Sequence, residues 1–315
     1  MLYASDGQQI VRVTMASAST ILEGRKAFAR QEWRKAYARL SAADDEAPLD
    51  PSDLERLATA AYLVGEDSHA ASAWTRAHHA LVDEGNVERA ARWGFWLSLC
   101  FLLERKIAQS TGWLARSQRL LQDRPTTCVE QGYSCVVSGL LAMGKGDAEG
   151  ASINFDEAAA LADQFDDPDL LTLALLGQGQ ILIRTRRVAE GLVRLDEAMV
   201  AVTAGDLSPI YAGIVYCAVI LACQSIFDLR RAREWTMALN DWCASQPDLV
   251  PFRGQCLVHR SEILQLKGDW AGALAEVERA CEWVAGRSDA VVGRAYYQRG
   301  ELHRLRGEFD LADQM

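Results

Sequence analysis

Apolar and small residues recur along the chain in a unit of about forty residues, and within each unit they follow a helical spacing. The clearest copies run from Leu257 to Ala280 and from Tyr296 to Ala312. Each copy holds one helical stretch, a turn of the form Leu-x-Gly-acidic-aromatic, and a second helical stretch with a small residue. Related copies cover residues 137–158 and 176–198. This period predicts an array of helical hairpins, because a hairpin buries its apolar face only by stacking on its neighbours.

One small residue in the second helix of every unit marks the register of the array. Successive markers are about 34 and then about 40 residues apart, which is typical of helical-hairpin arrays. We expect each marker where the two helices of a unit approach most closely, because a larger side chain would hold them apart. The markers are Ala36, Ala70, Ser110, Ala151, Gly191, Ala232, Ala273 and Ala312.

The residues at the predicted turns agree with this register. Glycine follows the first helix of several units, as at Gly146 and Gly268, and predicts a left-handed conformation there. Aromatic residues that follow the turns are expected to fill the space beside them; these are Trp33, Trp270 and Phe309.

The sequence therefore predicts an all-α fold, a right-handed superhelical solenoid of about eight tandem hairpins with a period of about 40 residues. We expect the solenoid over residues 20–315, after a polar N-terminal leader over residues 1–19 for which disorder is left open. The last hairpin is expected to be truncated, because the chain stops at Met315 inside its second helix. No β-run of any length competes with this interpretation.

The composition fits a globular protein and limits its partners. Half of the 315 residues are hydrophobic and 24% are charged, unlike the composition of disordered chains. The net charge of −10 argues against broad binding of nucleic-acid phosphates by this segment, because such binding requires an excess of Lys and Arg. The uncharged stretch from Pro209 to Cys223 is too short for a membrane span, which needs roughly 20 apolar residues. We expect it to be a buried helix with no role in a membrane.

Sequence features that carry chemistry are absent or incomplete. The eight cysteines contain no CxxC pair and lie among apolar neighbours, so we interpret them as free thiols and expect a cytoplasmic protein. The stretch from Gly139 to Gly146 resembles the phosphate-loop pattern GxxxxGK[ST], but Gly146 replaces the hydroxyl residue and no strand precedes it. The five histidines form no HExxH or similar pair, and no GxSxG elbow is present. The sequence therefore predicts no catalytic residue, no metal site, no cofactor and no enzyme activity.

The first helices of such an array are expected to line its concave face, and a protein or a small-molecule effector is expected to bind in that groove. Reversing the charge at Glu262 and Glu301 should therefore alter effector binding. The repeat register directs nine polar or aromatic side chains toward the groove, namely Tyr133, Gln180, Gln224, His259, Glu262, Gln265, Tyr297, Glu301 and Arg304.

Across nearly all of residues 20–315 the pattern resembles tetratricopeptide repeats that are longer than usual. More narrowly, three stretches resemble the helical-repeat region of LuxR-type transcriptional regulators: residues 110–121, 207–233 and 248–266. The resemblance implies repeats that sense a ligand or a protein and precede a C-terminal helix-turn-helix that binds promoter DNA. That module is not in this chain, so contact with DNA is expected only through it.

We therefore expect the sensor part of a bacterial transcriptional regulator, in which an effector in the groove changes how an attached DNA-binding module is presented. The alternative is a stand-alone scaffold that brings proteins together without DNA. A helix-turn-helix after Met315 would favour the first interpretation, and a polar capping helix would favour the second. The pattern leaves open whether the chain forms a homo-oligomer and whether translation starts at Met1 or Met15.

Overall fold

The computed structural model consists of helices joined by short turns, and its described residues contain no strand. It describes residues 18–122, 126–246, 248–285 and 290–315, so the expected leader lies outside the described residues up to residue 17. A first helix covers residues 18–29. The helices that follow are α2 (Trp33–Glu46), α3 (Pro51–Val64), α4 (Asp67–Asp83), α5 (Val87–Leu103), α6 (Ile107–Gln122), α7 (Val129–Gly144), α8 (Ala148–Phe165), α9 (Pro168–Arg184), α10 (Val188–Ala204), α11 (Pro209–Ser225), α12 (Leu229–Ser245), α13 (Val250–Leu266), α14 (Trp270–Val284), α15 (Ala290–Leu305) and α16 (Phe309–Ala312).

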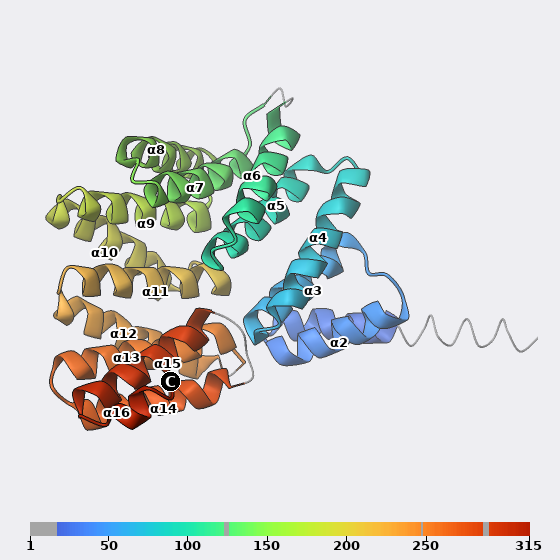
Figure 1. The fold of residues 1–315 in the computed structure, drawn as a ribbon. Helices are drawn as coiled ribbons and strands as arrows, with labels where there is room; N and C mark the ends of the chain where they lie inside the picture. Colours follow the sequence, from blue (N-terminus) through green and yellow to red (C-terminus); the bar gives the residue numbers. More distant parts are fainter. Residues whose placement is uncertain (1–17, 123–125, 247, 286–289) are drawn as a thin grey trace, which may run out of the picture.

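Consecutive helices pair as hairpins, and the hairpins follow one another around a nearly closed ring (Figure 1). The helix over residues 18–29 packs on α2, and each later hairpin joins an odd-numbered helix to the even-numbered helix after it. The odd-numbered helices from α5 to α15 also contact one another, so these first helices form the inner layer and their partners form the outer layer. The predicted all-α solenoid of tandem hairpins is confirmed.

Small residues lie buried where the two helices of a hairpin approach, as the sequence predicts, except Ala312 of the last hairpin, which is half-buried. A β-carbon added to Gly191 would lie 2.7 Å from the carbonyl oxygen of Gly179, so α9 and α10 meet through their backbones. Gly146 and Gly268 both have φ of 80°, the left-handed conformation predicted for the turns. Six further markers have no exposed surface, namely Ala36, Ala70, Ser110, Ala151, Ala232 and Ala273.

The aromatic residues beside the turns differ from one another in burial. Trp33 is buried, because Phe28 packs edge-on against its ring and its indole N–H donates a hydrogen bond to Gln246 at 3.4 Å. The prediction that Trp270 and Phe309 also fill such space is wrong, since these side chains are 40% and 63% exposed. Both lie on the last two hairpins, where the described residues place no second aromatic ring against them.

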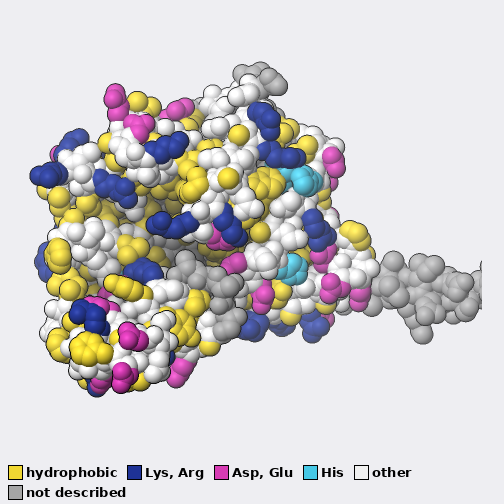
Figure 2. Space-filling view, in the orientation of Figure 1, with side chains coloured by type: hydrophobic (Ala, Val, Ile, Leu, Met, Phe, Trp, Pro, Cys, Tyr) yellow, Lys and Arg dark blue, Asp and Glu magenta, His cyan; other side chains and the backbone are white. Residues whose placement is uncertain are grey.

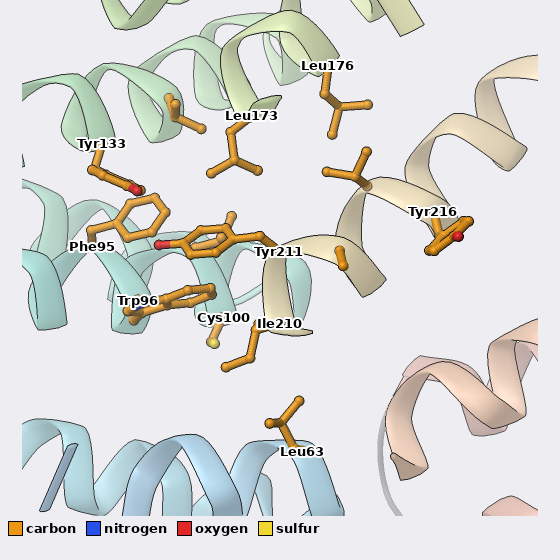
Figure 3. Packing of buried hydrophobic residues seen from close by; sticks show 14 of the residues in the cluster. Leu63, Phe95, Trp96, Cys100, Tyr133, Leu173, Leu176, Ile210, Tyr211 and Tyr216 are labelled. Atoms are coloured by element: carbon orange, nitrogen blue, oxygen red, sulfur yellow. The ribbon is translucent and has the colours of Figure 1, made fainter. Parts of the chain in front are cut away.

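One hydrophobic core runs from the first hairpin to α13. Figure 3 shows side chains of α3, α5, α7, α9 and α11 converging in this core. The ring of Tyr211 on α11 lies 4.7 Å from that of Trp96 on α5 and 6.1 Å from that of Tyr133 on α7, measured between centroids. Side chains therefore fill the concave face at this level, where the sequence predicted a groove.

The uncharged stretch at Pro209 to Cys223 forms most of α11, and this helix is buried around much of its circumference, as predicted. Its neighbours α9 and α13 lie on either side of it in the inner layer. Among the described residues, no helix combines the length and the apolar character that a membrane span requires.

The first two hairpins meet the region of α12 and α13 across the ring. Helix α3 contacts α13, and the first hairpin contacts the turn between α12 and α13. The backbone N–H of Arg34 donates to Asp248 Oδ2 at 3.2 Å, and the guanidinium of Arg34 lies 3.8 Å from the same carboxylate. These contacts close the superhelix into a ring.

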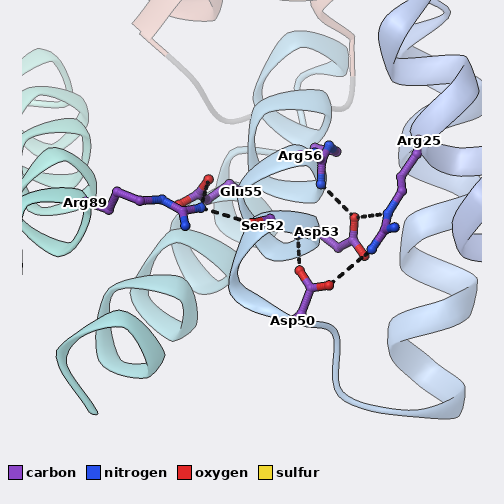
Figure 4. A network of polar contacts seen from close by, with 7 residues as sticks. All are labelled: Arg25, Asp50, Ser52, Asp53, Glu55, Arg56 and Arg89. Carbon is purple, nitrogen blue, oxygen red and sulfur yellow. Dashed lines mark hydrogen bonds and ion pairs between the residues drawn. The ribbon is translucent and has the colours of Figure 1, made fainter. Parts of the chain in front are cut away.

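Ion pairs fix the first helices near the start of the chain (Figure 4). Asp53 of α3 is buried, and it accepts hydrogen bonds from Arg25 at 2.6 and 2.8 Å and from Arg56 at 2.9 Å. Arg89 of α5 donates to Glu55 of α3 at 2.7 Å. The helix over residues 18–29, α3 and α5 are therefore held together by charge as well as by the core.

Candidate functional site

A network of polar side chains connects α11, α13 and α15 in the inner layer. Glu262 of α13 lies at its centre: it accepts a hydrogen bond from Gln224 of α11 at 3.0 Å and one from Arg294 of α15 at 2.6 Å. Beside it, Gln298 of α15 donates to Gln265 of α13 at 2.6 Å. The inner-face network comprises Gln224, Gln255, His259, Glu262, Gln265, Arg294 and Gln298.

His259 is buried beneath Glu262, and its protonation state decides which of its ring nitrogens donates a hydrogen bond. Its Nδ1 lies 3.3 Å from Glu262 Oε2, and its Nε2 lies 3.1 Å from Nε2 of Gln255. Burial lowers the pKa of His259, so the ring is neutral at pH 7. A neutral ring donates through one nitrogen and accepts through the other, which fits donation to Glu262 and acceptance from Gln255.

Glu262 is ionised although it is mostly buried. Burial alone would raise the pKa of Glu262, but its hydrogen bond with His259 and the positive charge of Arg294 outweigh burial and lower that pKa to about 2. The inner-face network therefore holds a paired carboxylate and guanidinium among neutral amides at pH 7. Such groups suit the recognition of a polar ligand, because they can exchange their present partners for those of the ligand.

Three of the predicted residues lie at the end of the array and do not join this network. Tyr297 is 74% exposed, and Glu301 accepts two hydrogen bonds from Arg304 at 2.7 Å on the surface of α15. The three side chains line a surface hollow of about 780 Å³ together with Phe309 and Met315.

On α15 the inward-facing positions that the sequence predicts lie one residue away from those in the structure. Arg294 and Gln298 face α13, and they lie two turns and one turn before the fully buried Leu302. Tyr297 and Glu301 each precede one of these inward positions by one residue, which rotates a side chain by about 100° around a helix. The apolar Leu302 is the sequence signal that could have identified the inward face.

Tyr133 lies in a separate buried cluster at the N-terminal ends of α7 and α9. Its ring lies 3.7 Å beneath the guanidinium of Arg92, and its hydroxyl donates to Asp167 at 2.9 Å. Arg92 also donates to Glu130 at 3.2 Å, and Asp167 caps α9 by accepting from the N–H of Leu170. Burial raises the pKa of Tyr133, so its hydroxyl remains a neutral donor. This fully buried ring holds α5, α7 and α9 together and does not face solvent.

Gln180 lies on the inner side of α9, between two hollows. It lines an apolar cavity of about 130 Å³ and an outer pocket of about 300 Å³. Its side chain is half-buried and has no hydrogen bond to the described residues. The structure thus gathers four of the nine predicted residues in one network, namely Gln224, His259, Glu262 and Gln265.

Other chemistry-bearing residues of the described chain have packing roles. No group of His, Cys, Asp and Glu among the described residues could hold a metal ion. All eight cysteines are free, and burial raises the pKa of Cys217 and of Cys223 to about 12, so these two are thiols at neutral pH. The phosphate-loop-like stretch is the end of α7 and its turn, and a β-carbon on Gly139 would lie 2.9 Å from the ring of Phe155.

Sequence comparison finds one short similarity. No protein-family model matches the chain. The human protein called tetratricopeptide repeat protein 36 is 42% identical over 62 residues, which cover 20% of this chain and 32% of that protein. The chain therefore spans about a third of the length of this curated relative.

Solved structures show the same fold at low sequence identity. The apo form of the quorum sensor NprR from B. thuringiensis has a TM-score of 0.56 and 11% identity, covering 86% of this chain and 77% of that chain. Apo RapI has a TM-score of 0.51 and 12% identity over 84% of this chain and 94% of its own. BtubC from P. vanneervenii has a TM-score of 0.51 and 20% identity over 67% and 87%. With the human relative, these likenesses support a tetratricopeptide-like helical-repeat fold.

Proposed function

We propose that this chain is the effector-sensing helical-repeat part of a bacterial transcriptional regulator, and that it controls an attached DNA-binding module. The observation that carries the proposal is the inner-face network, in which Glu262 joins three consecutive hairpins through partners on α11 and α15. The resemblance of three stretches to LuxR-type regulators supports it, and so does the fold shared with the quorum sensor NprR.

In this proposal the effector acts through α13. This helix carries Glu262 and also contacts α3 across the ring. An effector that takes over a partner of Glu262 shifts α13 against α15 and weakens the closing contact with α3. The effector moves the equilibrium between closed and open rings only as far as its affinities for the two states differ. Opening then repositions the last hairpins and the module attached to them.

The test measures DNA binding by the full-length protein that carries this chain. Its sites are first selected from fragmented genomic DNA of the source organism, and the Kd for the best fragment is then measured by fluorescence anisotropy. Glu262→Gln is compared with Glu301→Gln, which removes the same charge from an exposed pair on α15. We expect Glu262→Gln to change the Kd several-fold and Glu301→Gln to leave it unaltered.

Two results would overturn the proposal: no fragment is selected, or the two variants have the same Kd. The first result would favour a scaffold that joins proteins without DNA. Small-angle scattering of both variants completes the test, because the proposal requires a larger radius of gyration for Glu262→Gln alone.

A further inference from the structure

A small apolar cavity lies inside the ring where α5, α7, α9 and α11 meet. Its volume is about 130 Å³, and Gln180 provides the polar side chain of its lining. A dry cavity of about 150 Å³ with such walls is large enough for benzene. The cavity thus has room for an apolar group of about six carbons. The aliphatic walls include Leu99, Val136, Leu140, Leu173, Leu176 and Ile214.

An outer pocket adjoins this cavity, and a positively charged side chain lies at its rim. Its volume is about 300 Å³, and it shares Gln180 and Ala218 with the cavity. Arg184 lines it, and no carboxylate is part of its described lining. Arg184 donates to the carbonyl of Met143 at 3.2 Å and forms no ion pair within the described residues, so its charge is free to pair with an anion.

The two hollows together complement an amphipathic anion, because one is apolar and the other is lined by a cation. Figure 2 shows hydrophobic atoms exposed in the hollowed centre of the ring, with Lys or Arg side chains at its edge. Gln180 stands between the apolar walls and the cation, and its amide has no partner among the described residues. A carboxylate near Arg184 would accept hydrogen bonds from both side chains while its apolar group occupies the cavity.

We propose that the cavity between α5, α7, α9 and α11 binds a small monocarboxylate whose apolar group has about six carbons, with the carboxylate held at Arg184 and Gln180. This inference deepens the proposed function and rests on it for the regulatory role of the ligand. The binding itself is a separate property of the chain. Burial of each additional methylene should strengthen binding about fourfold until the cavity is full.

The test is isothermal titration of the chain with butyrate, hexanoate, octanoate and uncharged hexanol. Hexanoate should bind more than tenfold more tightly than butyrate, and octanoate should gain no more than about fourfold further, because one more methylene fills the cavity. Arg184→Gln should weaken hexanoate several-fold and leave hexanol unchanged. That difference separates recognition of the anion from burial of the tail.

Ala218→Leu is the variant that fills the junction of the two hollows, and it should weaken hexanoate at least tenfold. Ala159→Leu is its control, since Ala159 is a half-buried alanine of α8 that lines neither hollow. Circular dichroism checks that each variant is folded. If Ala218→Leu fails to fold, Leu173→Ala replaces it, and the enlarged cavity should then prefer octanoate.

The outcomes separate this inference from the proposed function. The cavity site is overturned if hexanoate does not bind at millimolar concentration, or if it binds the wild-type chain and Ala218→Leu equally tightly. If Glu262→Gln still alters DNA binding in that case, the proposed function stands. Hexanoate binding that follows the variants as expected, without any effect on DNA binding by the full-length protein, supports the site and counts against the regulatory role.

Discussion

Replacing Glu262 by Gln removes one negative charge from the inner-face network while keeping the length of the side chain. The amide oxygen can still accept from Gln224 or Arg294, but its NH₂ group faces the hydrogen-bond donors that the carboxylate accepted. Arg294 also loses the partner at 2.6 Å that neutralises it. The variant is therefore expected to weaken the packing of α13 on α15 and to leave the distant hairpins unaffected.

The magnitude follows from the pKa of Glu262, which the native network lowers from 4.5 to about 2. A depression of that size corresponds to about 3 kcal/mol of stability at pH 7. A carboxylate with a lowered pKa stabilises the fold at pH values above its unfolded pKa, and this contribution is lost as the pH falls toward the folded pKa. The difference between wild type and Glu262→Gln should thus shrink by about 1 kcal/mol between pH 7 and pH 4, and by more than half at pH 3.

Amide hydrogen exchange with peptide-level mass spectrometry is the appropriate assay, because repeat arrays open in parts and each part has its own free energy. Peptides from α13 and α15 should lose protection in Glu262→Gln at pH 7, and peptides from α4 to α6 should not. Glu301→Gln serves as the control, since its partner Arg304 is exposed on the same helix. It should leave the protection of both regions nearly unchanged.

Two results would refute this reasoning. One is a loss of protection in α13 that is the same at pH 7 and pH 3.5, because the effect would then not come from the charge of Glu262. The other is an equal loss in Glu301→Gln, which would mean that any carboxylate on these helices contributes alike.

Two further predictions concern packing and pH. Gly177→Ala should lower the free energy of unfolding by about 1–3 kcal/mol, because the new β-carbon would lie 2.3 Å from the buried ring of Phe155; Gly112→Ala on α6 meets no atom within 4 Å and should raise it by up to about 1 kcal/mol in the same urea titration. Burial, with a smaller contribution from Arg116, lowers the pKa of His78 to about 4, so the stability that depends on its neutral ring is complete above pH 6.5 and is lost as the pH falls toward 4. An NMR titration in which the ring of His78 becomes protonated near pH 6.5 would contradict this.

The sequence predicts hairpin pairing well, because pairing depends on local steric rules. Gly191 meets the backbone of Gly179, and the glycines of the turns have φ values that other residues rarely adopt. These requirements act on single positions and repeat with the unit, so one chain contains several examples of each. Helix order and the positions of the turns follow from them.

The inward face of each first helix is harder to predict, because it depends on how neighbouring hairpins rotate against each other. The inward face that the repeat register assigns to α13 is correct, because His259, Glu262 and Gln265 all join the inner-face network. The assignment is one residue out on α15, where Gln298 and Leu302 face inward in place of Tyr297 and Glu301. When a helix has apolar residues on several sides, its sequence does not show which side faces the neighbouring hairpin.

Tyr133 illustrates a second difficulty. An aromatic ring with one hydroxyl is compatible with a groove or with the core, and the choice depends on whether a buried acceptor is available. Here Asp167, which also caps α9, accepts from the hydroxyl, so the ring can be buried completely. The repeat pattern does not predict closure of the ring either, because Arg34 and Asp248 meet only after the twist of six hairpins has accumulated.

Closure changes what the concave face can do. In an open solenoid the first helices offer a continuous groove, but here one core connects them as far as α13, and Tyr211 of α11 packs on Trp96 across the ring. Helix α11 then belongs to both inner features: Ala218 lines the cavity, and Gln224, six residues or about 9 Å along the axis, donates to Glu262. A ligand that moves α11 therefore changes the geometry at Glu262. By thermodynamic linkage, an effector that binds at Glu262 and is coupled to the cavity through α11 would alter affinity at the cavity by the same factor as the cavity ligand alters the affinity for that effector.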